Sequence, residues 1–419
     1  VILIKLSFKF YPQLNNLQLS IIEELSFHTT KLYNIANYEC KEHGFKSYYN
    51  LEKMFKSNWH NKFLHSHTYQ QLLKVLEQDW KSFFQARKDY KTNPHKYKGI
   101  PQPPKYKNLE RRKNQIIFTN LATRVKSNVL LLSLSKKMQF MFNVESLNFV
   151  LPESVQKHIN MDALQQVKII WDNSKKSWCL IIIYKVEEQS LTKNFHNIMA
   201  IDLGLDNLCA ITFKDSKEQF LINGKPLKSK NSYYNKKIAR LTSVAMKQTG
   251  SNKFKRTKQI IKLQRKRNNY VNNYLHKVSR IIINLALEHK CSTVVIGDLK
   301  GIKQGSYVKG FVQIPVQRLV EQIKYKAQLV GIEVKLLKEE YTSGVSAYDL
   351  EPITKKYYNK SRRVKRGLFK TNQGYLVNSD VNGSLNILRK YVKDNVVPMS
   401  IFKLRDKGIL DMPVRIRVA

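Results

Sequence analysis

The sequence has few acidic residues for its size. Its 31 Asp and Glu stand against 74 Lys and Arg, so the formal net charge is +43 over 419 residues. A charge this one-sided makes a compact chain repel itself unless a polyanion neutralises it. We therefore expect the partner to be nucleic acid, whose phosphates bind Lys and Arg with release of counterions.

Cysteine and long apolar runs are also scarce. The four cysteines stand alone, without a C-x-x-C pair: Cys40, Cys179, Cys209 and Cys291. This pattern offers neither a zinc knuckle nor a disulfide framework and fits a reducing compartment. No apolar run approaches the ~20 residues that a membrane helix needs, and no secretory signal opens the chain. We expect an intracellular protein without structural zinc and without a membrane partner.

Hydrophobic periodicity predicts a β-module with a helical insertion in the first half of the chain. Residues 1–11 alternate as a strand, and residues 15–90 have mostly helical spacing. The connector over residues 91–108 is rich in Lys and Pro and cannot be helical through its prolines. Four strands are predicted after it: Gln115–Thr119, Val129–Leu134, Val167–Trp171 and Trp178–Val186. We expect the first strand to rejoin these later ones.

From about residue 195 the pattern becomes α/β. A strand pair around Asp202 leads to a basic loop, Lys225–Lys230, and then to two long basic helices over residues 231–290. A strand at 292–299, a helix at 315–329 and a strand at 332–337 follow. Strand, helix, strand in this order predicts a parallel, right-handed crossover. The fold class is therefore α+β, with several domains.

Two aspartates occupy positions typical of metal ligands. Asp202 ends a short apolar strand and is followed by Gly204, whose lack of a side chain suits a tight turn. Asp380 lies near the start of a predicted helix that continues through Leu385 and Leu388. We expect the two carboxylates to converge on a divalent cation. The competing interpretations are a turn residue for Asp202 and an N-cap for Asp380.

Aromatic residues alternate with lysines in two places where they could stack on bases beside a charged groove. One is the stretch around Tyr48 and Tyr49, and the other is Lys105-Tyr106-Lys107. The second basic helix is predicted to carry a row of phosphate-binding cations on its outer face: Lys253, Lys255, Arg256, Lys258, Lys262, Arg265, Lys266 and Arg267. We expect this row to bind nucleic acid because it has no acidic partners at helical spacing.

The motifs now resemble a known family. The segment IDLGLDNLCAI at 201–211, the strand VVIGDL at 294–299, Tyr341-Thr342-Ser343, and SDVNGSLNILRK at 379–390 are similar, in order, to the RuvC-type nuclease half of TnpB. TnpB proteins are RNA-guided DNA endonucleases of insertion-sequence transposons. The resemblance implies a wedge β-barrel over residues 1–11 and 105–190, a helical recognition lobe over 12–104, and an RNase H-like (RuvC) α/β nuclease domain over 191–419.

Two departures from the family pattern matter. The family carries a Glu where this chain has Gly297, and a four-cysteine zinc finger where residues 344–369 contain no Cys. The missing Glu has a candidate replacement at the end of the next strand, because adjacent strands lie only about 4.8 Å apart. We expect Glu339 to reach the metal site, with Glu340 as the second candidate. Asp298 is the third, although strand alternation would point it away.

The resemblance implies that Asp202, Glu339 and Asp380 hold two Mg²⁺ ions, with Mn²⁺ as an accepted substitute. The implied partners are a guide RNA from the transposon end and double-stranded target DNA in the bacterial cytoplasm and nucleoid. A short duplex motif beside the target would be read near Tyr48, Tyr49, Asn50 and Lys53. Two alternatives remain: a nuclease-inactive RNA-guided repressor, and a DNA-strand-transfer transposase. Monomer and dimer both remain open.

Overall fold

The computed structural model describes residues 3–190, 194–251, 256–298, 314–365, 367–393, 401 and 413–418. The chain divides into two compact units, Leu3–Val186 and the part from Glu187 onward. Each unit has its own buried apolar cluster. In the described residues, no helix is long and apolar enough to cross a membrane.

The first unit consists of two sheets and a set of helices. Four strands form one sheet in the order β1-β7-β6-β2, with β1 at Leu3–Phe10, β2 at Ile116–Thr119, β6 at Leu164–Asp172 and β7 at Ser177–Glu187. The first strand therefore rejoins the later ones, as predicted. The second sheet contains β3 (Thr123–Lys126), β4 (Val129–Ser133) and β5 (Ser146–Val150). The described strands thus form two separate sheets in this unit.

The helical insertion between β1 and β2 contains three α-helices: α1 (Asn16–Glu42), α2 (Tyr48–Phe55) and α3 (Ser66–Thr92). Asn15 begins α1 with a capping box, because its side chain accepts from the Gln18 amide while the Gln18 side chain accepts from the Asn15 amide. Two short helices, α4 (Lys136–Phe142) and α5 (Glu153–His158), lie in the region where the sequence predicted only strands. Each begins after a Ser or Pro that suits a helix start.

The second unit is built on a six-stranded sheet in the order β12-β11-β8-β9-β10-β15. Its strands are β8 (Asn197–Leu203), β9 (Asn207–Phe213), β10 (Phe220–Asn223), β11 (Cys291–Asp298), β12 (Glu333–Lys338) and β15 (Val414–Ile416). The β8, β9 and β10 strands form an antiparallel meander, whereas β11 runs parallel to both β8 and β12. The parallel crossover predicted between β11 and β12 is thereby confirmed.

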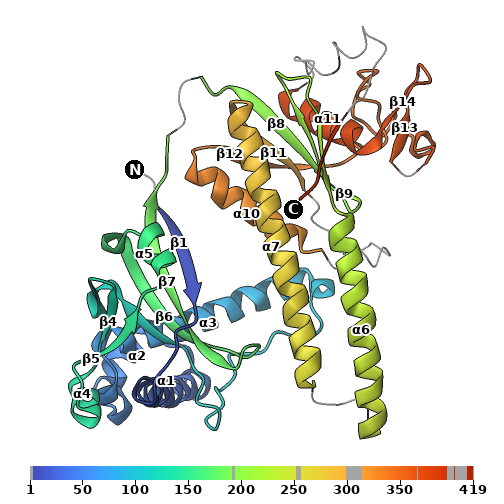
Figure 1. The fold of residues 1–419 in the computed structure, drawn as a ribbon. Helices are drawn as coiled ribbons and strands as arrows, with labels where there is room; N and C mark the ends of the chain where they lie inside the picture. The colour runs from blue at the N-terminus through green and yellow to red at the C-terminus, as the bar shows by residue number, and fades with distance from the viewer. Residues whose placement is uncertain are drawn as a thin grey trace. The chain divides into compact units, whose positions relative to one another are not determined.

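Helices cover both faces of this sheet. On one face, α7 (Lys258–Glu288) and α10 (Val316–Leu329) pack against alternate strand residues such as Ile201 and Ile296. On the other face, α11 (Ser379–Val392) packs Ile387 and Leu388 against Ala200 and Val295. Figure 1 shows α7 and α10 beside the sheet and α11 near β8. Since Asp202 and Gly297 lie two residues beyond Ala200 and Val295, both belong to the α11 face.

The second long basic helix was predicted well, but the start of the first was not. The helix α6 runs over Lys225–Thr249, so the predicted basic loop at Lys225–Lys230 is its first turns. The run of lysines suggested a loop, but the helix begins here, with Gly224 as its N-cap and Pro226 in its first turn, where Pro is tolerated. A short hairpin, β13 (Leu368–Lys370) and β14 (Leu376–Asn378), leads directly into α11.

Candidate metal and nucleic-acid site

A cavity of about 680 Å³ lies at the carboxyl ends of β8 and β12 and the beginning of α11. Among the described residues, four acidic side chains line it: Asp202, Asp206, Glu339 and Asp380. Four cationic side chains line it as well: Lys225, Arg363, Lys365 and Arg415. The three carboxylates expected from the sequence therefore share one cavity, although they are far apart in the chain. The cations provide positive charge that an anionic substrate could meet there.

Asp202 lies one residue before the end of β8, where the chain turns back into β9. The turn needs Gly204, because a Cβ there would come within 2.6 Å of the main-chain oxygen of Asn207. A second glycine, Gly383 in α11, makes room for the carboxylate itself. A Cβ at Gly383 would lie 2.6 Å from Asp202 Oδ2. Gly204 therefore makes room for the turn that follows Asp202, and Gly383 makes room for the Asp202 carboxylate.

Glu339 follows the last residue of β12 and reaches back over β11. A Cβ added to Gly297 would lie only 1.7 Å from Glu339 Oε1. The carboxylate thus occupies the space that a side chain at position 297 would take. Glu340 is exposed, and neither Glu340 nor Asp298 is among the described residues that line the cavity. Of the three candidates from the sequence, the structure brings Glu339 to Asp202 and Asp380.

Asp380 is not the N-cap of α11. That role belongs to Asn378, whose Oδ1 accepts from the main-chain N–H groups of Asp380 (2.9 Å) and Val381 (3.2 Å). The Asp380 carboxylate is therefore available to the cavity. Asn207 Nδ2 donates to Asp380 Oδ2 at 2.8 Å, and an Arg363 nitrogen lies 3.8 Å from Oδ1. These contacts reach Asp380 from the first residue of β9 and from the residue that follows the short helix Lys360–Arg362.

The electrostatics of the cavity disfavour negative charge on two of the carboxyl groups. Burial raises the pKa of Asp202 well above its ordinary value, and the charges of Glu339 and Asp380 raise it further, while Arg363 lowers it. Burial raises the pKa of Glu339 to about 7, with a further contribution from the charge of Asp298. Within the described residues, Glu339 Oε1 is buried without a hydrogen-bond partner. For both groups, burial and neighbouring negative charge outweigh the interactions that favour the charged form.

The carboxylates share the cavity but do not form a ready-made metal centre. No group of three or more His, Cys, Asp or Glu side chains in the described part of the chain is arranged to hold a metal ion. Like charges repel one another when no cation lies between them, so such a cluster tends to spread apart. The donor set nevertheless fits a hard cation, because carboxylate oxygens are the ligands that Mg²⁺ prefers.

Several residues of this site were assigned no role from the sequence, although Asn207 and Gly383 lie within its motifs. Arg363 follows the short helix at Lys360–Arg362, in a basic stretch that resembles many others in the chain. Asn207 is 173 residues from Asp380, and Gly383 is an ordinary glycine inside a helical pattern. Local patterns cannot show such contacts, since the partners are brought together only by the packing of α11 on the sheet.

The aromatic candidates of the first unit lie on α2. Tyr49 is 73% exposed, and Asn50 and Lys53 are exposed beside it. Tyr48 is half-buried, with Lys74 Nζ 4.8 Å from its ring centre. The outer face of α2 therefore presents one aromatic ring, an amide and a cation to solvent.

Lys105 and Lys107 differ in their surroundings. Lys105 is exposed, whereas Lys107 is half-buried and its Nζ lies 4.5 Å from the ring centre of Tyr33. The Lys107 main chain exchanges two hydrogen bonds with the Asn34 side chain, at 2.7 and 2.9 Å. Lys107 is therefore held by the fold, and Lys105 is the freer contact for a phosphate.

The cations predicted on α7 separate into outer and inner positions. Arg256, just before the helix, is exposed, as are Lys262 and Lys266, while Arg265 is half-buried. Arg267 was predicted on the outer face, but its Nε donates to Asn231 Oδ1 of α6 at 2.8 Å. This prediction was wrong because α6 packs along α7 and covers that side. Lys253 and Lys255 lie outside the described residues.

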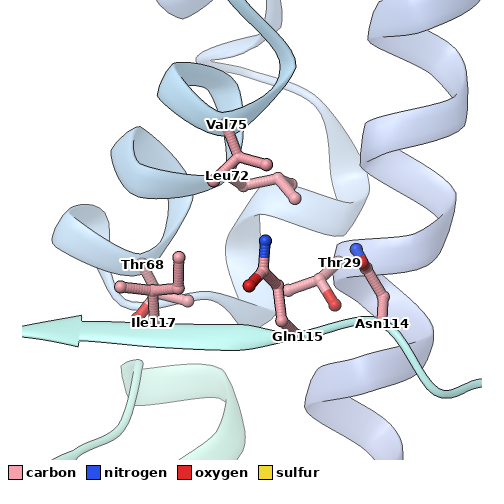
Figure 2. Close-up of a pocket in the computed structure, with 7 residues that line it drawn as sticks. All are labelled: Thr29, Thr68, Leu72, Val75, Asn114, Gln115 and Ile117. Carbon is pink, nitrogen blue, oxygen red and sulfur yellow. The ribbon is translucent and has the colours of Figure 1, made fainter. Parts of the chain in front are cut away.

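A second pocket, in the first unit, is too small for a ligand. Figure 2 shows it between α1, α3 and the beginning of β2, where the Thr29, Asn114 and Gln115 side chains face Thr68 and Leu72. Its volume is about 10 Å³, which is at most the space of one water molecule. The acidic cavity of the second unit, at about 680 Å³, does have room for a substrate, and it is the described cavity lined by several carboxylates.

Two family models match the second unit and the strand before it. The OrfB_IS605 model, described as a probable transposase, matches residues 181–303. The model of the Cas12f1-like TNB domain matches residues 317–387. Together the two matches span β8, β11, β12 and most of α11, and they include Asp202, Glu339 and Asp380.

Curated relatives match more of the chain. A TnpB-like protein, ORF457 of Acidianus two-tailed virus, is 24% identical over 408 residues, covering 90% of this chain and 85% of that protein. The CRISPR-associated endodeoxyribonuclease Cas12f1 of Sulfoacidibacillus thermotolerans is 27% identical over 241 residues, covering 56% of this chain and 55% of that protein. The match thus spans about half the length of this second relative.

Solved structures have a similar fold. A Cas12f1 complex with single-guide RNA and target DNA superposes with a TM-score of 0.59 at 15% identity, covering 88% of this chain and 82% of that one. CasPhi-2 (Cas12j) bound to crRNA superposes with a TM-score of 0.56 at 9% identity, covering 94% and 99%. At these identities the likeness concerns the fold.

Proposed function

We propose that this chain, a TnpB-type protein by its family matches and relatives, is an RNA-guided endonuclease that cleaves double-stranded DNA beside a short motif. One observation carries the proposal. The Glu339 carboxylate lies 1.7 Å from where a Gly297 Cβ would be, in the cavity that Asp202 and Asp380 line. Acidic side chains that line one cavity of a strongly basic chain suit metal-assisted hydrolysis of a phosphodiester, because they can hold the cations and the chain can hold the polyanion.

Asp202, Glu339 and Asp380 are the residues that would hold two Mg²⁺ ions, or Mn²⁺ in their place. The raised pKa values of Asp202 and Glu339 and the unpartnered Glu339 Oε1 support this, because a cation would relieve the repulsion they reveal. When bound, such ions supply an activated water and stabilise the leaving oxygen.

The other residues of the cavity position substrate and carboxylates. Asn207 holds Asp380 through its amide, and Arg363 offsets negative charge near Asp380 and Asp202. Lys225 and Arg415 line the same cavity and would neutralise the phosphates of a DNA strand. Asp206 is paired with Lys228 at 3.0 Å, so it is a less suitable metal ligand than the other three.

Guide RNA and target DNA are the partners that we propose. The net charge of +43 supports polyanion binding, and the Cas12f1 and CasPhi-2 structures that share this fold contain guide RNA, the former also target DNA. Pairing with the guide would select the sequence, while the protein reads only a short duplex motif. Tyr49, Asn50 and Lys53 on α2 are proposed readers of that motif.

The proposed division of labour follows the chain. The strands over 1–11 and 105–190 would form the wedge domain, and residues 12–104 would form the recognition lobe. The pairing of β1 with β7 across the helical insertion supports this arrangement. Residues 191–419 would be the nuclease domain, and the meander β8–β10 followed by the parallel β11 and β12 is consistent with an RNase H-like sheet.

The test is cleavage of a plasmid by the full chain with its co-purified RNA, in Mg²⁺ and in Mn²⁺. We expect Asp202→Ala, Asp380→Ala and Glu339→Gln each to lower the cleavage rate by about 10³-fold or more while guide-directed DNA binding survives. Glu340→Gln is the matched control and should cut normally, since its side chain is exposed and outside the cavity.

Each contrary outcome selects a different function. If the unmutated complex binds its target but never cuts, the repressor alternative is correct. If the purified chain carries no RNA and joins DNA ends, it is a strand-transfer transposase. Normal cutting by Glu339→Gln would show that the third ligand is elsewhere, with Asp298 the next candidate.

A further inference from the structure

Three consecutive main-chain carbonyls, those of Lys338, Glu339 and Glu340, accept hydrogen bonds. Lys390 Nζ donates to the Lys338 oxygen at 2.9 Å and lies 3.5 Å from the Glu340 oxygen. The Glu339 oxygen accepts from the Thr342 hydroxyl at 2.9 Å and from the Thr342 amide at 3.3 Å. The segment therefore cannot turn about its own axis without losing several hydrogen bonds.

Further contacts to this segment, besides those of Thr342, come from α11. Asn386 Nδ2 donates to the main-chain oxygens of Thr342 (2.9 Å) and Val345 (2.7 Å). Lys390 is one helical turn further along, so the two side chains form a stripe on the same side of the helix. Thr342 itself is buried, with 3% of its surface exposed, so its hydroxyl makes its bond out of water's reach.

The same helix also positions the carboxylates of Asp202 and Asp380. Asp380 lies in its first turn, and Gly383 leaves the space that the Asp202 carboxylate fills. Ser384 Oγ donates to the Ala200 oxygen at 3.0 Å, which docks α11 on β8. One helix thus carries Asp380, leaves the space that the Asp202 carboxylate fills, and contacts the main chain on both sides of Glu339. A shift of α11 would change all three together.

We propose that Thr342 and Lys390 are positioning residues that hold the Glu339 main chain so that its carboxylate lies over Gly297. The inference rests on the proposed function, since it concerns the same site. Such contacts matter here because β12 ends at Lys338, so Glu339 lies beyond the strand residues that are paired with β11 in the described part of the chain. In a loop without these bonds, the carboxylate would sample many positions and order only when a cation bound.

The first test removes the Thr342 hydroxyl without changing the volume of the side chain. Thr342→Val should weaken Mn²⁺ binding about tenfold, as loss of a group that orients a metal ligand does, and Thr342→Ser should stay within about twofold of the unmutated protein. Thr123→Val is the matched control. Its buried hydroxyl donates to the Thr119 oxygen at 2.5 Å in the other unit, so its loss costs similar stability without touching the cavity.

The Mn²⁺ affinity is measured by electron paramagnetic resonance on the protein–RNA complex without target DNA, which requires no turnover. Hydrogen exchange of the amides at 338–345 in metal-free protein is the second readout, and it should be faster in Thr342→Val and in Lys390→Met. Lys390→Arg should restore the exchange rates because it retains a donor. Unchanged exchange and unchanged Mn²⁺ affinity in both Thr342→Val and Lys390→Met would overturn the proposal.

A double-mutant cycle separates this inference from the proposed function. If the two residues act through Glu339, then Thr342→Val should not weaken Mn²⁺ binding further in a Glu339→Gln background. Full additivity would assign Thr342 a general structural role and overturn the inference alone. If Glu339→Gln by itself binds Mn²⁺ and cuts normally, the site assignment fails instead.

Discussion

The acidic cavity and the basic helices α6 and α7 belong to the same unit but are built in opposite ways. The cavity depends on buried or partly buried groups with named partners, such as Asn207 on Asp380 and Thr342 on Glu339. The helices present exposed lysines, such as Lys262 and Lys266, to solvent. Buried polar contacts fix the position of a side chain closely, whereas exposed charges contribute only to the electrostatic potential around the protein.

This difference predicts two kinds of mutational response. A small change in the cavity should abolish most of the cleavage activity, because it displaces a carboxylate whose position is fixed by its surroundings. A change on the helices should act weakly and additively, because neighbouring cations share the same phosphates. Mutations that broke this rule would show that one of the two surfaces has been assigned the wrong role.

The largest effect is expected at Gly297. Gly297→Ala places a methyl group where Glu339 Oε1 now lies, so the carboxylate must leave. We expect the protein to fold, since only the end of a side chain has to move, and the cleavage rate to fall by about 10³-fold. The control is Gly99→Ala, where a Cβ meets nothing within 4 Å.

The same site permits a rescue. Glu339→Ala empties the space over Gly297, and adding Gly297→Glu should return a carboxylate to the cavity and part of the activity. The single substitution Gly297→Glu, with Glu339 still present, should cut far less well than this double variant. If the double variant remained as inactive as Glu339→Ala, position 297 would not face the metal site.

A somewhat smaller effect is expected at Gly383, where stability and activity should change in opposite directions. Ala is favoured over Gly inside a helix by about 1 kcal/mol, so Gly383→Ala should leave the melting temperature unchanged or raise it. Its Cβ would lie 2.6 Å from Asp202 Oδ2, however, and must displace that carboxylate. We expect at least a ~100-fold loss of cleavage. Normal cleavage by a stable Gly383→Ala variant would mean that Asp202 does not act from this position.

The smallest effect is expected on α7. Lys262→Gln and Lys266→Gln should each weaken RNA binding only several-fold and lower the slope of log affinity against log salt by about 1 per lost phosphate contact. The cleavage rate of the saturated complex should stay the same. Lys157→Gln removes the same charge from an exposed site on α5 and serves as the control. If Lys157→Gln lowered the slope of log affinity against log salt by the same amount, the effect of the α7 variants would be explained by the loss of net charge alone.

Much of the architecture followed from periodicity. The strand before Asp202, the helix after Asp380 and the rejoining of β1 with the later strands were all predicted, because apolar spacing records which face of an element is buried. The beginning of α6 was not predicted, because its lysine-rich composition is typical of an exposed loop. The contact of Arg267 with α6 was not predicted, because no local pattern shows which helix will pack against this side of α7.

The sequence by itself determined the charge, most of the helices and strands, and the two aspartates, since these depend on residues close together in the chain. Only the tertiary structure decided which glutamate joins them. Glu339, Glu340 and Asp298 all lie at the same end of neighbouring strands, and the choice depends on the space over Gly297 and on bonds from α11 some 50 residues away. Such choices are made by packing, because steric exclusion and hydrogen bonding act between atoms that are close in space, regardless of their separation in sequence.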